Sequence, residues 1–131
     1  MYSQVFTYSG QNSSHPAGAA SSSFSNTDSS GDNCACGAIT TSYAYSKVVG
    51  LLFYESSSSA SGTTLSSYEF GSNAATEEYS NAGQIYLGNY ELFAIFDLVQ
   101  ASAGSTGAFS VSTSNLPYSA LKAAIFEIPT S

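Results

Sequence analysis

From residue 38 onward, runs of β-branched and aromatic residues alternate with short breaks rich in Ser, Gly and Asn. Such runs favour strands, and breaks of this composition favour turns. The predicted strands are 38–45, 47–55, 64–70, 84–87, 90–100, 107–113 and 120–128. Strands at this spacing, with no long helix between them, are typical of an antiparallel β-sandwich or jelly roll. We therefore predict an all-β domain over residues 38–131.

Side-chain alternation within the predicted strands indicates which face is buried. In the run 90–100, one parity is entirely apolar and the other contains Glu91 and Asp97. Successive side chains of a strand point to opposite faces, so the apolar parity is the predicted core face. Its members are Leu92, Ala94, Phe96 and Leu98. Acidic residues that alternate with apolar ones or end a strand, such as Glu127, are interpreted as solvated or edge-protecting charges.

The last run, 120–128, begins with good helix formers but ends in Ile125, Phe126 and Ile128 before Pro129. A β-branched and aromatic ending that stops at a proline favours a closing strand over a helix.

The first 37 residues differ from the rest in composition. Residues 9–37 contain almost no large apolar side chains and are rich in Ser and Gly, a composition typical of flexible linkers. A short strand is predicted before them, at 2–8. We predict that residues 1–37 form an extended N-terminal arm that a neighbouring subunit holds. The predicted assembly contacts are Tyr2, Phe6, Tyr8 and Phe24.

The C-terminal third resembles a recurring, jelly-roll-like β-sandwich domain. The resemblance rests on three series of residues, 91–96, 103–112 and 120–128, which correspond to a strand, a turn with the following strand, and a closing strand. Domains with this pattern occur in phage and secreted bacterial structural proteins. The tryptophan that usually precedes the closing strand is absent, and Tyr118 stands near its place. The resemblance implies a β-sandwich fold and a structural role.

Charge is scarce and unbalanced. Charged residues make up 8% of the chain, against roughly 25% in an average soluble domain, and the net charge is −7. The basic side chains, Lys47 and Lys122, are too few for binding to nucleic acid or to an anionic membrane surface. The N-terminus lacks the basic and apolar regions of a signal peptide, so we expect no export by that route.

No constellation of residues in the sequence points to catalysis. His15 is the single histidine and lies in the predicted arm, and no Gly-x-Ser-x-Gly motif occurs among the many serines. A nucleophile needs an activating base, and none can be assigned from the sequence. We therefore predict a protein that is not an enzyme and that has no cofactor.

Two groups of residues carry weaker predictions of binding chemistry. Cys34 and Cys36 are too close in sequence to close an unstrained disulfide with each other. They are interpreted as small buried hydrophobes, as partners in an intersubunit disulfide, or as half of a metal site completed by a second copy. Asp28, Asp32 and Asn33 could supply oxygen ligands to calcium, although a solvated turn is the favoured interpretation of these residues.

A surface rich in Ser, Thr, Asn and Tyr suits contact between subunits, because short hydroxyl side chains lose little entropy when they are covered. We expect a virion structural protein, either a capsid decoration (cement) protein or a minor capsid subunit, that binds copies of itself and a particle protein. Virions assemble in the host cytoplasm, which agrees with the expected lack of an export signal. One alternative is a secreted filament or surface-layer subunit that assembles by strand donation.

A second alternative is a carbohydrate-binding module. It would use exposed tyrosines as a stacking platform for sugar rings, whereas the competing interpretation places them on sheet faces and at subunit contacts. The tyrosines concerned are Tyr43, Tyr45, Tyr54, Tyr68, Tyr79, Tyr86, Tyr90 and Tyr118.

Overall fold

A computed structural model describes residues 5, 7–26, 33–56, 64–86, 89–114 and 119–130. These residues contain strands and no helix, and hence no helix that could cross a membrane. The strands are β1 (Ala20–Asn26), β2 (Asn33–Cys36), β3 (Thr40–Thr41), β4 (Ser46–Ser56), β5 (Thr64–Phe70), β6 (Asn73–Ala74), β7 (Thr76–Tyr86), β8 (Asn89–Gln100), β9 (Gly104–Ser105), β10 (Phe109–Ser114) and β11 (Ser119–Ile128). Every pairing between them is antiparallel. The predicted all-β antiparallel sandwich is confirmed.

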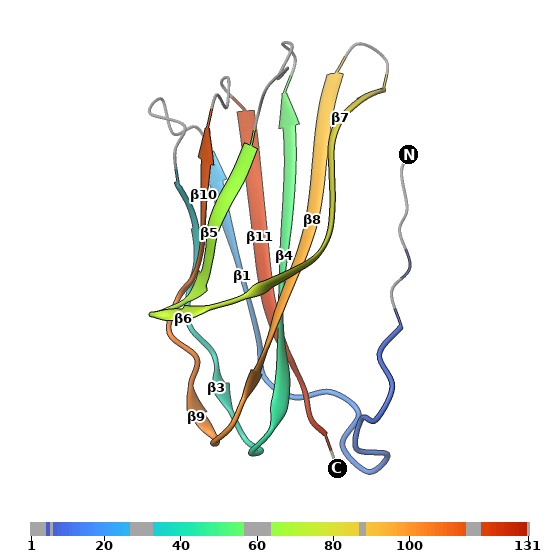
Figure 1. Ribbon diagram of the computed structural model, residues 1–131, viewed down its shortest axis with the longest axis vertical. Coiled ribbons are helices and arrows are strands. Elements are labelled where there is room, and N and C mark those ends of the chain that lie inside the picture. The colour runs from blue at the N-terminus through green and yellow to red at the C-terminus, as the bar shows by residue number, and fades with distance from the viewer. Residues whose placement is uncertain are drawn as a thin grey trace.

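Two sheets form the sandwich (Figure 1). The larger has the order β1-β11-β4-β8-β7, and the smaller has the order β2-β10-β5-β6. The two-residue strands β3 and β9 pair with each other and so connect the loop before β4 to the loop after β8. The chain leaves β5 through β6 and crosses to the other sheet as β7, as Figure 1 shows.

The core lies between the two sheets and is aromatic at its centre. Phe96 from the larger sheet meets Phe109 from the smaller one, with ring centroids 5.8 Å apart, and Phe70 lies 5.0 Å from Phe109. The predicted core face of β8 is confirmed, because Leu92, Ala94 and Phe96 belong to the buried core and Leu98 packs against it partly buried. Each large apolar side chain buried in this way contributes ~1.5–3 kcal/mol relative to an exposed one.

Gly50 lets the two sheets approach at this point. A Cβ at Gly50 of β4 would lie 2.6 Å from Cε2 of Phe109 and 2.7 Å from its Cζ. Real Cβ atoms do not come that close to a neighbouring ring, so the glycine provides the space that the Phe109 ring occupies.

The stretch predicted as arm contains two strands. Residues 20–26 pair as β1 with β11 along its whole length, and residues 33–36 pair as β2 with β10. Both are edge strands of their sheets. A polar edge strand needs only backbone N–H and C=O groups to pair, so the lack of large apolar side chains does not prevent it. Among the described residues, the extended N-terminal part is thus confined to those before β1.

Two other predicted strands differ from those observed. Only Thr40 and Thr41 of the predicted strand 38–45 pair, because the chain turns before β4 with Tyr45 at a positive φ of 58°. By contrast, β7 is longer than the predicted 84–87 and runs through the predicted break at 81–83. Its register with β8 shifts between Ala82 and Gln84, so a bulge accommodates Gly83 without ending the strand.

Candidate functional site

The middle of the larger sheet is apolar on the face that points away from the core. On it, Val49 of β4 is the cross-strand partner of Phe126 in β11, and Leu51 is that of Ile95 in β8. We call the hollow over this face the outer groove. Its sheet wall consists of Val49, Leu51, Phe93, Ile95, Phe126 and Ile128.

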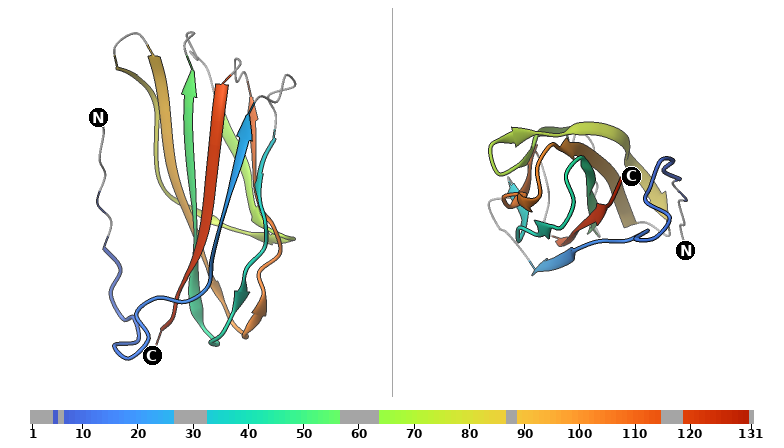
Figure 2. Two further views of the ribbon diagram at one scale, coloured as in Figure 1. Left: turned by 180° about the vertical axis from the view of Figure 1, so that it is seen from behind. Right: turned by 90° about the horizontal axis from the view of Figure 1, so that it is seen from below.

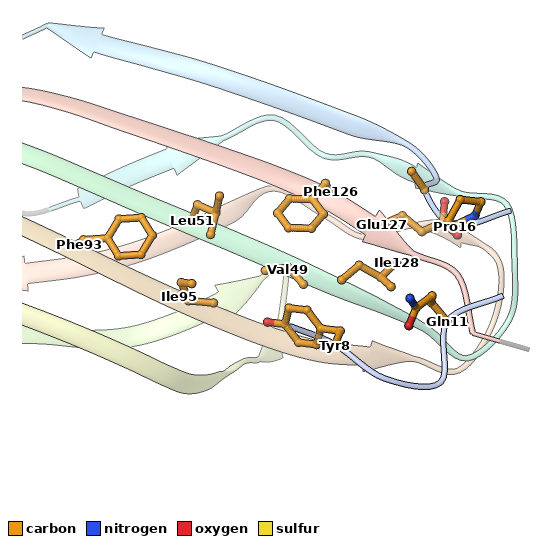
Figure 3. Close-up of a pocket in the computed structure, with 11 residues that line it drawn as sticks. Tyr8, Gln11, Pro16, Val49, Leu51, Phe93, Ile95, Phe126, Glu127 and Ile128 are labelled. Atoms are coloured by element: carbon orange, nitrogen blue, oxygen red, sulfur yellow. The ribbon is translucent and has the colours of Figure 1, made fainter. Parts of the chain in front are cut away.

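The opposite wall of the outer groove is the N-terminal segment, which we define as residues 7–19. In Figure 2 this segment runs along the side of the larger sheet that faces away from the smaller one. Tyr8, Gln11, Pro16 and Ala17 line the groove from this side. The space enclosed is about 410 Å³, within the range of pockets that hold ligands or peptide side chains. Figure 3 shows Phe93 at one end of the groove and Gln11 and Pro16 at the other.

An apolar outer face has a signal in the sequence of β4. Residues 48–53 form the uninterrupted apolar run Val-Val-Gly-Leu-Leu-Phe. Such a run is typical of a strand that is covered on both faces, whereas a strand with one solvated face alternates. Accordingly Val48 and Leu52 are buried towards the core, and Leu51 and Phe53 stay partly exposed on the other side.

Glu127 holds the end of the N-terminal segment that leads into β1. Its side chain is only 1% exposed overall. One carboxylate oxygen accepts hydrogen bonds from the Ser46 hydroxyl at 2.7 Å and the Tyr43 amide at 3.2 Å. The other accepts from the Ala19 amide at 3.1 Å, and the Ser42 amide donates to both oxygens. The prediction that Glu127 is a solvated or edge-protecting charge is therefore wrong, because the turn at 42–46 and the N-terminal segment cover the end of β11.

The pKa of Glu127 follows from this environment. Burial raises the pKa of the carboxyl, because removal from water penalises the charged form. The hydrogen bonds from Ser46, Ala19, Ser42 and Tyr43 act in the opposite direction and prevail, so the net pKa is lowered. Glu127 is thus a stable buried anion that organises three separate segments.

Gly18 is required where the N-terminal segment passes Glu127. A Cβ at Gly18 would lie 2.5 Å from Cδ of the Glu127 side chain. The amide of Gly18 also donates to the Glu127 carbonyl at 3.1 Å. The absence of a side chain at Gly18 therefore lets the segment reach the carboxylate.

A second polar cluster lies beside the outer groove. Lys47 and Asp97 form an ion pair of 2.8 Å, in which the Asp97 side chain is almost wholly buried. Lys47 Nζ lies 5.1 Å from the centroid of the Tyr8 ring, and the Asp97 carboxylate is close enough to the Tyr8 hydroxyl to affect its pKa. Burial is the largest cause that raises the pKa of Tyr8 to about 12, followed by the negative charges of Asp97 and Glu78. The Lys47–Asp97 pair thus holds Tyr8 over the outer face of the larger sheet.

A third cluster ties the smaller sheet to β7. The Tyr68 hydroxyl donates to Glu77, and the Tyr68 ring stacks on Phe96 with centroids 4.2 Å apart. Burial, followed by the bond to Glu77, raises the pKa of Tyr68 to about 12. Ser80 donates to the other oxygen of Glu77. These contacts tie β7 to β5.

The two cysteines lie in one strand, β2. Cys36 is a free thiol, 2% exposed, that packs in the core as a small hydrophobe. Cys34 pairs through its backbone with Val111, and its side chain lies outside what the structure describes. The intersubunit disulfide stays a prediction, and at Cys36 it would require β2 to leave the core.

Most other predicted site residues fall outside the described part. Asp28 and Asp32 lie there, as does the side chain of Asn33, so the calcium prediction is not addressed. Tyr2 and Phe6 also lie outside the described residues. No cluster of metal-ligating side chains occurs among the residues that the structure does describe.

Two predicted contact residues lie within the described backbone. Phe24 lies in β1 opposite Lys122, with its side chain undescribed, and Tyr8 lines the outer groove of its own chain. The tyrosines with described side chains come from separate places. Tyr68 lies on β5, Tyr79 on β7, and Tyr43 and Tyr45 in the loop before β4.

Comparisons with models of protein families, with curated proteins and with solved structures give no match.

Proposed function

We propose that this protein is a non-enzymatic structural subunit of a virion, a capsid decoration or minor capsid protein, that binds neighbouring subunits through the outer groove. The observation that carries the proposal is the apolar outer face of the larger sheet, where Leu51, Phe93 and Phe126 remain partly exposed around an unfilled space. The apolar lining of this hollow supports the docking of a neighbouring chain there.

The composition supports assembly. With 8% charged residues, the chain has few of the side chains that keep neighbouring molecules apart. Closed symmetry would then repeat one modest contact in every subunit and so raise the stability of the whole particle. The virion assignment rests on this composition and on the resemblance of the C-terminal third to phage structural domains.

The groove is tested by light scattering coupled to size-exclusion chromatography. We expect the full-length protein to elute as an oligomer and the variant Leu51→Thr/Phe93→Thr to elute as a monomer with an unchanged β-sheet circular dichroism spectrum. Threonine keeps the strand preference while removing apolar area. The matched control is Val99→Thr, an exposed residue of β8 on the same face but outside the groove.

Assembly of the groove variant at wild-type levels would contradict the proposed docking surface. The virion assignment has its own test, mass spectrometry of purified particles from the source organism. Absence of the protein from particles would overturn that assignment and leave the docking surface standing.

A self-polymerising secreted filament subunit is the second candidate. It is supported by β1, an edge strand near the N-terminus that pairs with β11 through the backbone, as a donated strand would. Growth of the purified protein into filaments of unlimited length, in place of a closed oligomer, would select this candidate.

A further inference from the structure

We infer that the turn at residues 12–15 is a site of N-linked glycosylation, at which a transferase joins a sugar to the side-chain amide of Asn12. The sugar comes from a donor in which its anomeric carbon is bonded to a diphosphate. This inference goes beyond the proposed function, because it rests on the turn and not on the outer groove.

The acceptor pattern occurs once in the sequence. Asn12-Ser13-Ser14 is the one place where Asn is followed two residues later by Ser or Thr, with no Pro between them. Transferases of N-linked sugars recognise this pattern. Ser13, Ser14 and His15 are exposed, and Asn12 is partly exposed. An enzyme can therefore reach the tripeptide in the folded chain.

The backbone fixes the tripeptide at one end of the sandwich, beside the end of β11 (Figure 2). The Asn12 amide donates to the Pro129 carbonyl at 2.8 Å. The His15 amide donates to the Asn12 carbonyl at 3.2 Å, as in a β-turn. The acceptor is thus held in an exposed turn, and no neighbouring strand of the sheet covers it.

The side chain of Asn12 is oriented by two backbone amides. Its Oδ1 accepts from the Ser14 amide at 2.9 Å and from the His15 amide at 3.1 Å, which is an Asx-turn across the tripeptide. Its Nδ2 makes no hydrogen bond within the described part of the chain. The nitrogen that would receive the sugar is therefore available.

The same two hydrogen bonds favour the chemistry. An amide nitrogen is a poor nucleophile, because its lone pair is delocalised onto the carbonyl oxygen. When Nδ2 loses a proton, negative charge develops on Oδ1. Donors already placed at that oxygen stabilise the charge, so the reactive form of the side chain is easier to reach.

The transfer itself is a displacement at the sugar. A base of the transferase takes one proton from Nδ2, and the nitrogen forms a bond to the anomeric carbon. The bond from that carbon to the diphosphate oxygen breaks, and its electron pair leaves with the diphosphate. The diphosphate is carried either on a nucleotide, in the cytoplasm, or on a lipid, at a membrane.

A sugar at this position agrees with the composition of the chain. With 8% charged residues, the surface has few of the side chains that normally keep a protein soluble. A glycan is bulky and solubilising. It would hydrate this end of the sandwich and confine contacts between copies to other faces.

The first test is mass spectrometry of the protein purified from its source organism. Cleavage after lysine gives a peptide that ends at Lys47 and contains Asn12. We expect its mass to exceed that of the sequence by one or more sugar residues, with fragment ions that place the sugar on Asn12. A wholly unmodified peptide would overturn the inference.

The second test uses the purified, folded full-length protein and distinguishes the two donors. One arm supplies UDP-glucose and a soluble N-glycosyltransferase, and the other supplies a lipid-linked oligosaccharide and membranes that contain an oligosaccharyltransferase. Modification in either arm supports the inference and identifies the donor. No modification in either arm overturns it. Asn12→Gln and Ser14→Ala should lose the added mass, whereas Ser13→Ala keeps the recognised pattern and should retain it.

A matched variant tests the role of the turn. Asn12→Gln/Ala75→Ser moves the pattern to residues 73–75, where Asn73 and Ala74 are also exposed but lie in strand β6. There the amide of residue 75 donates to the Tyr68 carbonyl at 2.8 Å, so it is not free to complete an Asx-turn.

We expect this variant to be modified at least about tenfold more slowly than the wild type, the rate effect of losing about one hydrogen bond. Circular dichroism checks that the variant keeps the fold. Equal rates would show that the turn does not present Asn12, and that part of the inference would be wrong.

Discussion

Glu127 joins three parts of the chain that are distant in sequence: the base of the N-terminal segment, the turn at 42–46 and strand β11. It does so without a basic partner, since its described contacts are backbone amides and the Ser46 hydroxyl. A buried carboxylate is tolerated only where such donors replace its hydration. Glu127 therefore holds in place the N-terminal segment, which is one wall of the outer groove.

We predict that Glu127→Gln lowers the free energy of unfolding by ~1–3 kcal/mol, because an amide has one acceptor oxygen and leaves buried N–H groups unpaired. Urea denaturation at neutral pH measures the change. The control is Glu78→Gln, which alters an exposed carboxylate and should stay within ~0.5 kcal/mol of the wild type. Equal stabilities of the two variants would contradict the role given to Glu127.

The same carboxylate gives the stability a pH dependence. The pKa of Glu127 is lower in the folded protein than its ordinary value of 4.5. Between the two pKa values the unfolded chain binds more protons, so stability rises with pH there. The contribution is complete above pH 4.5 and is lost as the pH falls through the folded-state pKa. Below pH 4.5, the free energy of unfolding should therefore change less with pH for Glu127→Gln than for the wild type. Denaturation curves recorded at a series of pH values measure it.

At the scale of elements, β4 contributes side chains both to the core and to the outer groove. Its inward side chains, Val48 and Leu52, are in the core, and its outward ones line the groove. Gly50 sits between these inward residues, under the Phe109 ring. The spacing between the two sheets at the centre of the sandwich depends on that missing side chain.

We predict that Gly50→Ala destabilises the fold by ~1–3 kcal/mol, because a methyl group would overlap the Phe109 ring. The check is a double-mutant cycle with Phe109→Leu, which removes the ring atoms concerned. The double variant should lose less stability than the sum of the two single variants. Strict additivity would show that the ring and the glycine do not interact.

The elements that sequence patterns predicted are those rich in apolar, β-branched and aromatic residues. Strands β5, β8 and β11 were predicted within a residue or two, since their side chains alternate or end in β-branched residues. Strands β1 and β2 were not, because Ser-rich edge strands pair through backbone groups that every sequence possesses. The bulge in β7 was missed because Asn-Ala-Gly also favours a turn.

At the scale of the whole molecule, the sandwich is one sheet with an apolar outer side and a smaller sheet that closes the core. The outer side has only the N-terminal segment over it in the described chain (Figure 2). A subunit built in this way gains stability when a neighbour covers that side, because apolar area leaves water. Assembly and stability are then linked.

This linkage predicts that the melting temperature rises with protein concentration, since subunits that bind the folded state shift its equilibrium with the unfolded one. Differential scanning fluorimetry over a hundredfold range of concentration measures the effect. The Leu51→Thr/Phe93→Thr variant should show a melting temperature independent of concentration. A wild-type protein with the same independence would argue against assembly of copies through the groove.

By itself, the sequence determined the class of structure: strands, turns and the inward face of β8 follow from local preferences that act over a few residues. Only the tertiary structure decided that Glu127 is buried and that Tyr8 lies beside Lys47. It also decided that a groove lies between the N-terminal segment and the larger sheet. Such features depend on which distant segments pass over a strand, and strand pairing through the backbone leaves no trace in local periodicity.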